Sequence, residues 1–196
     1  VFNDQVRAFV DYFTLKDREY TKGVIERRDL FFPIFEETLA KNNMPDELKY
    51  LSIVESGLRA NAISRVGAGG LWQFMPSTGR AYRLNQSWYI DERMNPQQAT
   101  EAACKYLREL YNMFDDWELA LAAYNTGPGN VRRAIRRSGY KKTFWDIYPY
   151  LPRETRSYLP QFVAIIYTFN YLQEHNFVEH ELDMQAAIDY DTIHIN

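Results

Sequence analysis

The apolar residues of this chain recur every three or four positions over most of its length, and this spacing predicts helices. The clearest case is the segment that follows Asn95-Pro96, where seven residues mark one long helix: Ala99, Ala102, Ala103, Tyr106, Leu107, Leu110 and Met113. An Asn N-cap followed by Pro at the first helical position is a strong start signal. Only residues 190–195 alternate like an edge strand or a linker, so the pattern predicts about eight or nine helices and no sheet.

The same spacing locates the other helices. We expect two short amphipathic helices within residues 1–30, and further helices at residues 30–41, 45–57, 76–82, 116–124, 131–137 and 153–172. Pro160 either kinks or restarts the last of these. Residues 59–70 form a loop with three glycines, but the Lys-Ser/Thr of a phosphate-binding P-loop is missing, so a nucleotide site is excluded there. The four arginines at 131–137 are more typical of a solvated face than of a binding patch.

The helix expected at residues 45–57 carries the most informative side chain. Pro45 suits its first position and Gly57 its end. Helical spacing places Glu55 on the inward face with three other residues, Leu48, Leu51 and Ser52. Burial and the negative end of the helix dipole both disfavour a carboxylate in the last turn. We therefore expect Glu55 to have a pKa of roughly 6 and to act as a general acid, the alternative being a surface Glu at a frayed helix end.

Composition narrows the class of protein. The chain has 196 residues, of which 46% are hydrophobic and 16% aromatic, enough for one well-packed globular domain. A net charge of −3 argues against general nucleic-acid binding. The single Cys104 cannot form an internal disulfide and is expected to be a small buried residue, and three His with one Cys predict neither a metal site nor a cofactor. The many rings fit an aromatic core or a sugar-binding groove.

The chain shows no pattern of a membrane or targeting segment. The longest apolar run, 162–172, is too short to span a bilayer, and residues 1–4 do not resemble a signal peptide. The sequence therefore predicts no transmembrane segment in this chain.

Four segments occur in the order and spacing of a known family: Glu55-Ser56, residues 70–76 (GLWQFMP), residues 123–125 (AYN) and residues 154–158 (ETRSY). Together they resemble the signature of the lytic transglycosylases with a goose-type lysozyme-like (SLT) catalytic domain, and most closely its membrane-bound type D branch. The resemblance covers roughly residues 5–175. It implies an all-α, lysozyme-like domain with an extended C-terminal tail.

The resemblance also implies an organisation and a location. N-terminal helices at 1–44 would pack on a catalytic domain at 45–178, and residues 179–196 would be a tail or linker. In such proteins a similar tail leads to LysM modules, of which none is present here. The partner would be the glycan strands of peptidoglycan, and the location the cell envelope, in the periplasm.

The chemistry that the resemblance implies uses one carboxyl group. Family members cleave the β-1,4 bond from N-acetylmuramic acid to N-acetylglucosamine and close the muramyl 6-hydroxyl onto C1, leaving a 1,6-anhydro end. Glu55 matches the only catalytic acid and base. A hydrolysing muramidase of goose type and an inactive peptidoglycan-binding module are the alternatives.

Eight further positions match substrate-binding positions of the family. Ser64 and Gln73 match contacts to the sugar near the scissile bond, and Met75 a groove wall. The remaining matches are Trp72, which stands where many members have Met, Tyr124, whose hydroxyl would lie beside Glu55, and Asn125, Glu154 and Tyr158. Structural alternatives are a loop cap for Ser64, a helix cap for Asn125, and packing for Met75 and Trp72.

Overall fold

The protein is described here by a computed structural model, which covers residues 2–177. These residues form nine α-helices: α1 Asp4–Asp11, α2 Arg18–Lys41, α3 Leu51–Ser56, α4 Pro76–Ala81, α5 Pro96–Phe114, α6 Trp117–Thr126, α7 Pro128–Arg137, α8 Phe144–Ile147 and α9 Arg153–Asn170. Short 3₁₀ or π turns lie at Tyr12–Lys16, Asp46–Tyr50, Glu92–Met94 and Tyr148–Tyr150. No strand occurs within residues 2–177, which contain only isolated bridges, so the all-α prediction is confirmed.

Side-chain caps begin the long helices where the sequence predicts them. The Asn95 side chain accepts a hydrogen bond from the Gln98 amide at 2.9 Å, and Pro96 opens α5. Asp116 accepts from the Leu119 amide at 2.8 Å and opens α6. Each cap satisfies an amide that has no partner within its helix.

Two predicted helix starts need correction. A single α2 runs through Pro33, so the separate helix expected to begin at Leu30 does not exist. Of the two alternatives for Pro160, a restart is excluded, because α9 continues through this proline. Pro45 precedes a 3₁₀ turn, and α3 begins only at Leu51. In α2 and α9 the apolar stripes that bury against the core extend across the proline, and this burial outweighs the lost backbone hydrogen bond.

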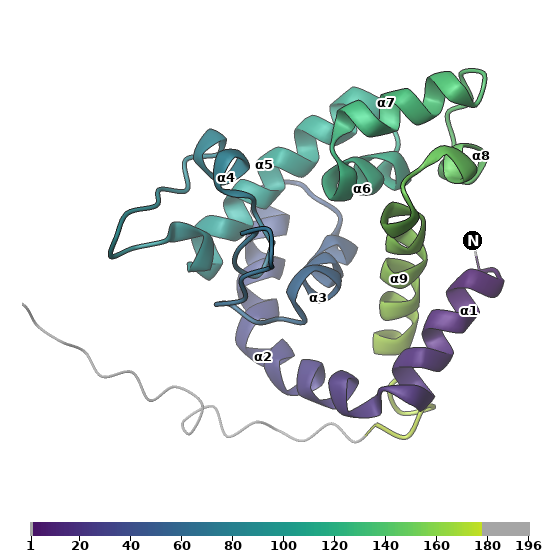
Figure 1. Ribbon diagram of the computed structural model, residues 1–196. Coiled ribbons are helices and arrows are strands. Elements are labelled where there is room, and N and C mark those ends of the chain that lie inside the picture. The colour runs from purple at the N-terminus through teal and green to yellow at the C-terminus, as the bar shows by residue number, and fades with distance from the viewer. Residues whose placement is uncertain (1, 178–196) are drawn as a thin grey trace, which may run out of the picture.

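The helices pack around one main core (Figure 1). α2 and α5 are neighbours, α5 packs on α6, and α1 lies along α9. The indole of Trp72 is fully buried among them, with its ring centroid 5.3 Å from that of Phe35. Cys104 is also buried, as predicted, and burial raises the pKa of its thiol to about 11. This core holds α3, α6 and α9 in place around the site described below.

No helix within residues 2–177 combines the length and the apolar character needed to span a bilayer. The predicted tail at 179–196 lies outside the described residues.

Candidate active site

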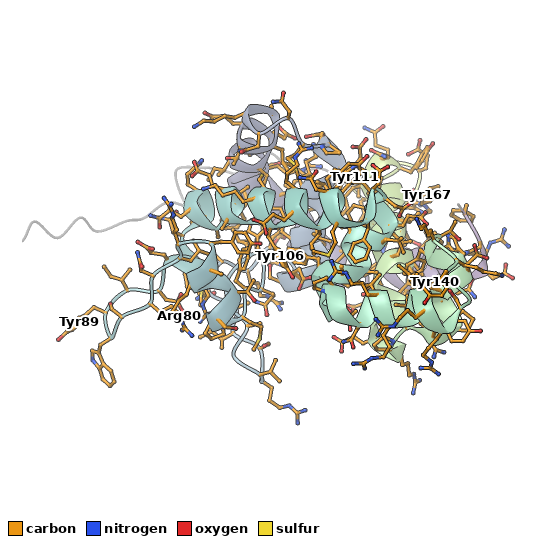
Figure 2. The ribbon with its side chains drawn as sticks, turned by 90° about the horizontal axis from the view of Figure 1, so that it is seen from above. Arg80, Tyr89, Tyr106, Tyr111, Tyr140 and Tyr167 are labelled. Atoms are coloured by element: carbon orange, nitrogen blue, oxygen red, sulfur yellow. The ribbon has the colours of Figure 1, made fainter. Side chains whose placement is uncertain are left out.

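A cleft of about 410 Å³ opens beside the C-terminal end of α3. Its walls come from α3, the loop that precedes α4, the middle of α5 and the facing ends of α6 and α9. Tyr106, near the middle of α5 in Figure 2, contributes to the wall. The lining residues that the sequence predicted are Glu55, Ser64, Gln73, Met75, Tyr124, Asn125, Glu154 and Tyr158. Residues distant in the sequence therefore meet at one hollow, as the motif resemblance implies.

Glu55 lies in the last turn of α3, and the backbone around it is held in place. Gly57 ends the helix in the left-handed conformation, with φ +60°. Arg27 Nε donates to the Gly57 carbonyl at 2.9 Å, and the Ser56 hydroxyl donates to the Leu71 carbonyl at 3.0 Å. These bonds fix the helix end from two sides, so the direction of the Glu55 side chain is defined by α2 and by the loop.

The Glu55 carboxyl is partly exposed to the cleft and has one close partner. The Tyr158 hydroxyl, from α9, donates a hydrogen bond to Glu55 Oε1. The pKa of Glu55 is raised to about 7: burial is the largest cause, the Tyr158 hydrogen bond opposes the shift, and the charge of Glu154 adds a smaller increase. The direction agrees with the prediction from sequence. Glu55 is thus a carboxyl that can be protonated or ionised near neutral pH.

A second hollow of about 340 Å³ adjoins the cleft on another side of Glu55. It shares four lining residues with the cleft, namely Val54, Glu55, Ser64 and Gln73. Tyr20 and Arg59 contribute to its other walls. The carboxyl of Glu55 therefore stands where two hollows meet, with space for ligand groups on both sides.

The glycine loop forms the wall opposite the helices, and Arg93 holds it in shape. The buried Arg93 guanidinium donates to the Gly67 carbonyl at 2.7 Å and to the Phe74 carbonyl at 2.8 Å, and it pairs with Asp91 at 2.7 Å. A Cβ on Gly70 would lie 1.9 Å from the Arg93 carbonyl oxygen, and Gly70 has φ +80°. Only glycine allows this approach. The loop packs on the protein's own backbone rather than on a phosphate.

Ser64 and Gln73 line the cleft and also stabilise the loop. Ser64 Oγ accepts from the Ala68 amide at 3.0 Å, which is the loop cap considered from sequence. Gln73 adopts φ +48°, and its Nε2 donates to the Gly70 carbonyl at 2.9 Å and the Ala62 carbonyl at 3.2 Å. A non-glycine residue with positive φ is uncommon and is often found at functional sites.

The end of α6 contacts the start of α9 beside the cleft. The Tyr124 hydroxyl donates to the Trp72 carbonyl at 2.8 Å, and Thr155 Oγ1 donates to Asn125 Oδ1 at 2.9 Å. Burial, with a further contribution from the charge of Glu55, raises the pKa of Tyr124 well above its usual value. Both tyrosines near Glu55, Tyr124 and Tyr158, therefore stay protonated at neutral pH.

Trp72 is the one predicted site residue, within residues 2–177, that does not line the cleft. Its side chain is 0% exposed, and its Nε1 donates to Thr100 Oγ1 at 2.9 Å. The prediction that Trp72 binds substrate is wrong, because its ring faces are covered by the core. Trp72 contacts the site through its backbone carbonyl, which accepts the hydrogen bond from the Tyr124 hydroxyl. Met75, in contrast, is 40% exposed on the cleft wall.

Sequence reasoning missed several lining residues, among them Tyr106, Thr78 and Gln161. Gln161 could have been found, because Glu154, Tyr158 and Gln161 fall at i, i+4 and i+7 and so share one face of α9. Tyr106 had only the signal of a polar ring on an otherwise apolar stripe. Within residues 2–177 there is no group of three or more His, Cys, Asp or Glu that could hold a metal ion.

Comparison with known proteins gives a consistent result. The family model of the transglycosylase SLT domain matches residues 32–147. The chain is 38% identical over 167 residues to membrane-bound lytic murein transglycosylase D of Escherichia coli (strain K12), a match that covers 83% of this chain and 36% of that protein. The chain thus spans about a third of the length of this relative.

Two solved structures share the fold. They are lytic transglycosylase Slt from Pseudomonas aeruginosa, as an inactive Glu→Gln mutant, and the 70 kDa soluble lytic transglycosylase from Escherichia coli. Each has a TM-score of 0.59 and 24% sequence identity. The matches cover 71% and 72% of this chain and 24% of each neighbour. The helical architecture is therefore the lysozyme-like fold that the motifs implied, and the chain belongs to the transglycosylase SLT domain family.

Proposed function

We propose that this chain is the catalytic part of a peptidoglycan lytic transglycosylase, with Glu55 as its single acid and base. The observation that carries the proposal is a carboxyl group with a pKa of about 7 at the junction of two hollows, hydrogen-bonded by a tyrosine. The 38% identity to a lytic murein transglycosylase supports the choice of substrate. A place in the cell envelope, in the periplasm, follows from the same substrate.

In the first step the protonated Glu55 donates its proton to the glycosidic oxygen, and the bond from this oxygen to C1 of N-acetylmuramic acid breaks. The departing N-acetylglucosamine leaves with a 4-hydroxyl, Glu55 is left as a carboxylate, and C1 of the muramyl sugar carries the balancing positive charge as an oxocarbenium-like centre. The Tyr158 hydroxyl donates to this carboxylate and stabilises it. A pKa close to the working pH suits both the acid and the base form.

In the second step the Glu55 carboxylate takes the proton of the muramyl 6-hydroxyl while that oxygen bonds to C1. The product is a 1,6-anhydro ring, Glu55 is protonated again, and no water is consumed. Attack by a group of the same sugar is favoured because it is already close and oriented. The cycle therefore needs no second carboxyl group to activate water.

One feature of the cleft favours a second candidate, a hydrolysing muramidase. Glu154 is a second carboxyl on the cleft wall, and glycosidases that use water place two carboxyl groups around the bond. Glu154, however, is exposed in the first turn of α9, whereas Glu55 is largely buried beside Tyr158. We assign it to binding of the strand and not to proton transfer.

Digestion of purified sacculi in ¹⁸O-labelled water separates the two candidates. Transglycosylation predicts unlabelled muropeptides one water lighter than the hydrolytic products, and hydrolysis predicts labelled reducing ends. We expect E55Q to release almost nothing and E154Q to give the same anhydro products as the wild type. Labelled ends that disappear in E154Q would assign hydrolysis instead. A wild-type protein that binds sacculi and releases nothing would be a binding module.

A further inference from the structure

The segment from Pro128 to Arg153 carries a charge opposite to that of the rest of the chain. Its 26 residues contain seven Lys or Arg and one acidic residue, Asp146, whereas the other 170 residues contain 16 Lys or Arg and 25 Asp or Glu. A positive region on a chain of net charge −3 creates a local field that attracts anions, and the negative remainder repels them.

The cations of α7 form one continuous outer stripe. Val131 and Ala134 are buried beneath the helix, and on the opposite side four exposed arginines are stacked in two i, i+4 pairs: Arg132 with Arg136 and Arg133 with Arg137. We refer to these four residues as the arginine stripe. Like charges at this spacing destabilise a helix by about 0.2–0.5 kcal/mol per pair. The stripe therefore works against the stability of α7.

The arginine stripe has no carboxylate partner within residues 2–177. The one contact of the stripe is the Arg137 guanidinium over the Tyr150 ring, 5.6 Å from its centroid. Some cations in other parts of the fold are paired, such as Lys49 with Glu36 and Asp46, or Arg93 with Asp91. None of the four guanidinium groups is therefore neutralised by a carboxylate within the described residues.

The helix that carries the stripe begins close in the chain to one end of the cleft. Asn125 lines the cleft and is followed, after Gly127, by α7. Arg153 directly precedes the cleft residue Glu154, and α7, α8 and the start of α9 lie together in the upper right of Figure 1. A strand seated in the cleft would therefore carry its substituents toward this positive region.

We propose that the arginine stripe binds the carboxylates of the peptide stems on the peptidoglycan strand whose sugars occupy the cleft. The inference rests on the proposed function, because that function defines the strand in the cleft. The stems are peptides that branch from the glycan and carry free carboxylates. Guanidinium groups bind carboxylates in a bidentate manner, and a row of them matches a row of stems along a strand.

The test compares two quadruple variants that each lose four positive charges. R132Q/R133Q/R136Q/R137Q removes the stripe and keeps good helix-forming residues on an exposed face. The control replaces four exposed cations that lie outside the cleft by Gln: Arg7, Lys16, Lys41 and Lys105. Initial rates are measured on glycan strands with their stems and on strands from which an amidase has removed the stems.

For the stripe variant we expect KM on stem-bearing strands to rise about tenfold, since four exposed charge contacts are lost, while kcat stays within about twofold. On stem-free strands the stripe variant should match the wild type, and the control variant should match it on both substrates. In about 0.5 M salt the difference should vanish, because exposed charges are screened over a few ångströms. An equal change on both substrates, or no change on either, overturns the proposal.

Co-sedimentation with sacculi and binding to lipid vesicles test the stripe separately from the proposed activity. If the wild type cleaves neither substrate, the proposed function fails, and co-sedimentation with sacculi before and after amidase treatment tests the stripe independently. Stem-dependent binding that is lost in the stripe variant would still support it. Vesicles of phosphatidylcholine with phosphatidylglycerol test the other anionic surface. Stripe-dependent binding to vesicles without any stem dependence would assign the stripe to lipid and reject the proposal.

Discussion

The two walls of the cleft are built in different ways. The helical wall places Glu55 from α3, Tyr124 from α6 and Tyr158 from α9 around one point, and each side chain is fixed by the core beneath its helix. The loop wall, at residues 59–75, has no helix behind it: Leu71, Trp72 and Phe74 anchor one end of the loop in the core, and the guanidinium of Arg93 holds its backbone. The helical wall supplies the chemistry, and the loop wall supplies the shape of the groove.

The walls also differ in what they do to a carboxyl group. On the helical wall, burial raises the pKa of Glu55. Behind the loop wall, hydrogen bonds from Arg93 lower the pKa of Asp91, so that this carboxyl stays ionised and anchors the loop. Asp91 has a buried cation as its partner, so it stays ionised and has a structural role. Glu55 has a buried tyrosine and no cation as its partner, so it can gain and lose a proton near neutral pH.

The largest expected effect on the rate comes from replacing the Glu55 carboxyl by an amide of the same size. E55Q keeps the volume of the side chain but has no exchangeable acid proton, so kcat should fall by about 10²–10⁴-fold. Single-turnover rates on isolated glycan strands measure this loss. Binding of the strands by E55Q should stay within about threefold of the wild type, since the groove is intact. Residual cleavage near the wild-type rate would remove Glu55 from the mechanism.

E55Q should also change how stability depends on pH. The pKa of Glu55 in the fold, about 7, exceeds its ordinary value of 4.5, so its contribution to stability is fully present below pH 4.5 and is lost as the pH rises to 7. Relative to the wild type, E55Q should gain roughly 3 kcal/mol between pH 4.5 and 8. Urea denaturation at several pH values measures the difference, and a constant difference would contradict the raised pKa.

G70A should perturb the packing of the loop wall most selectively, and G67A is its matched control. Both glycines have positive φ, but a Cβ on Gly67 meets nothing within 4 Å, whereas one on Gly70 would meet the Arg93 carbonyl oxygen. G67A should therefore cost about 1–2 kcal/mol of unfolding free energy, from backbone strain alone. G70A should cost about 3 kcal/mol or more and raise KM. Equal costs in thermal unfolding would mean that Arg93 does not pack closely on the loop.

Y158F tests the hydrogen bond that joins α9 to α3 in the helical wall. Loss of the hydroxyl removes the hydrogen bond that stabilises the Glu55 carboxylate, so the pKa of Glu55 should rise and the alkaline limb of kcat/KM should move to higher pH. Because a bond to a charged group is lost, kcat at pH 6 should fall about tenfold or more. A limb that moves to lower pH would show that Tyr158 does not act on the carboxylate.

E154Q should have the smallest effect and the opposite sign. The charge of Glu154 raises the pKa of Glu55, so its removal should move the alkaline limb slightly to lower pH. Since Glu154 is exposed and its charge is screened, kcat/KM at the optimum should stay within about threefold. A loss comparable to that of E55Q would make Glu154 a second catalytic carboxyl.

The helical wall could largely be predicted from the sequence, and the loop wall could not. Helical spacing with a glycine stop placed Glu55 inward at the end of α3, and the motif order placed Tyr124 beside it and Tyr158 in the same site. The role of Arg93 had no local signal, because its bonds to Gly67 and Phe74 link residues 26 and 19 positions apart. Trp72 was misassigned for the same reason, since its partners Phe35 and Thr100 are both far away in the sequence.

The measurement that tests the account most directly is the titration of the Glu55 carboxyl carbon by NMR, with E55Q identifying the signal. The account predicts a midpoint near pH 7, which Y158F raises. A midpoint at or below 4.5, the ordinary value for Glu, would mean that the cleft does not hold this proton, and Glu55 could not then be the acid of the reaction.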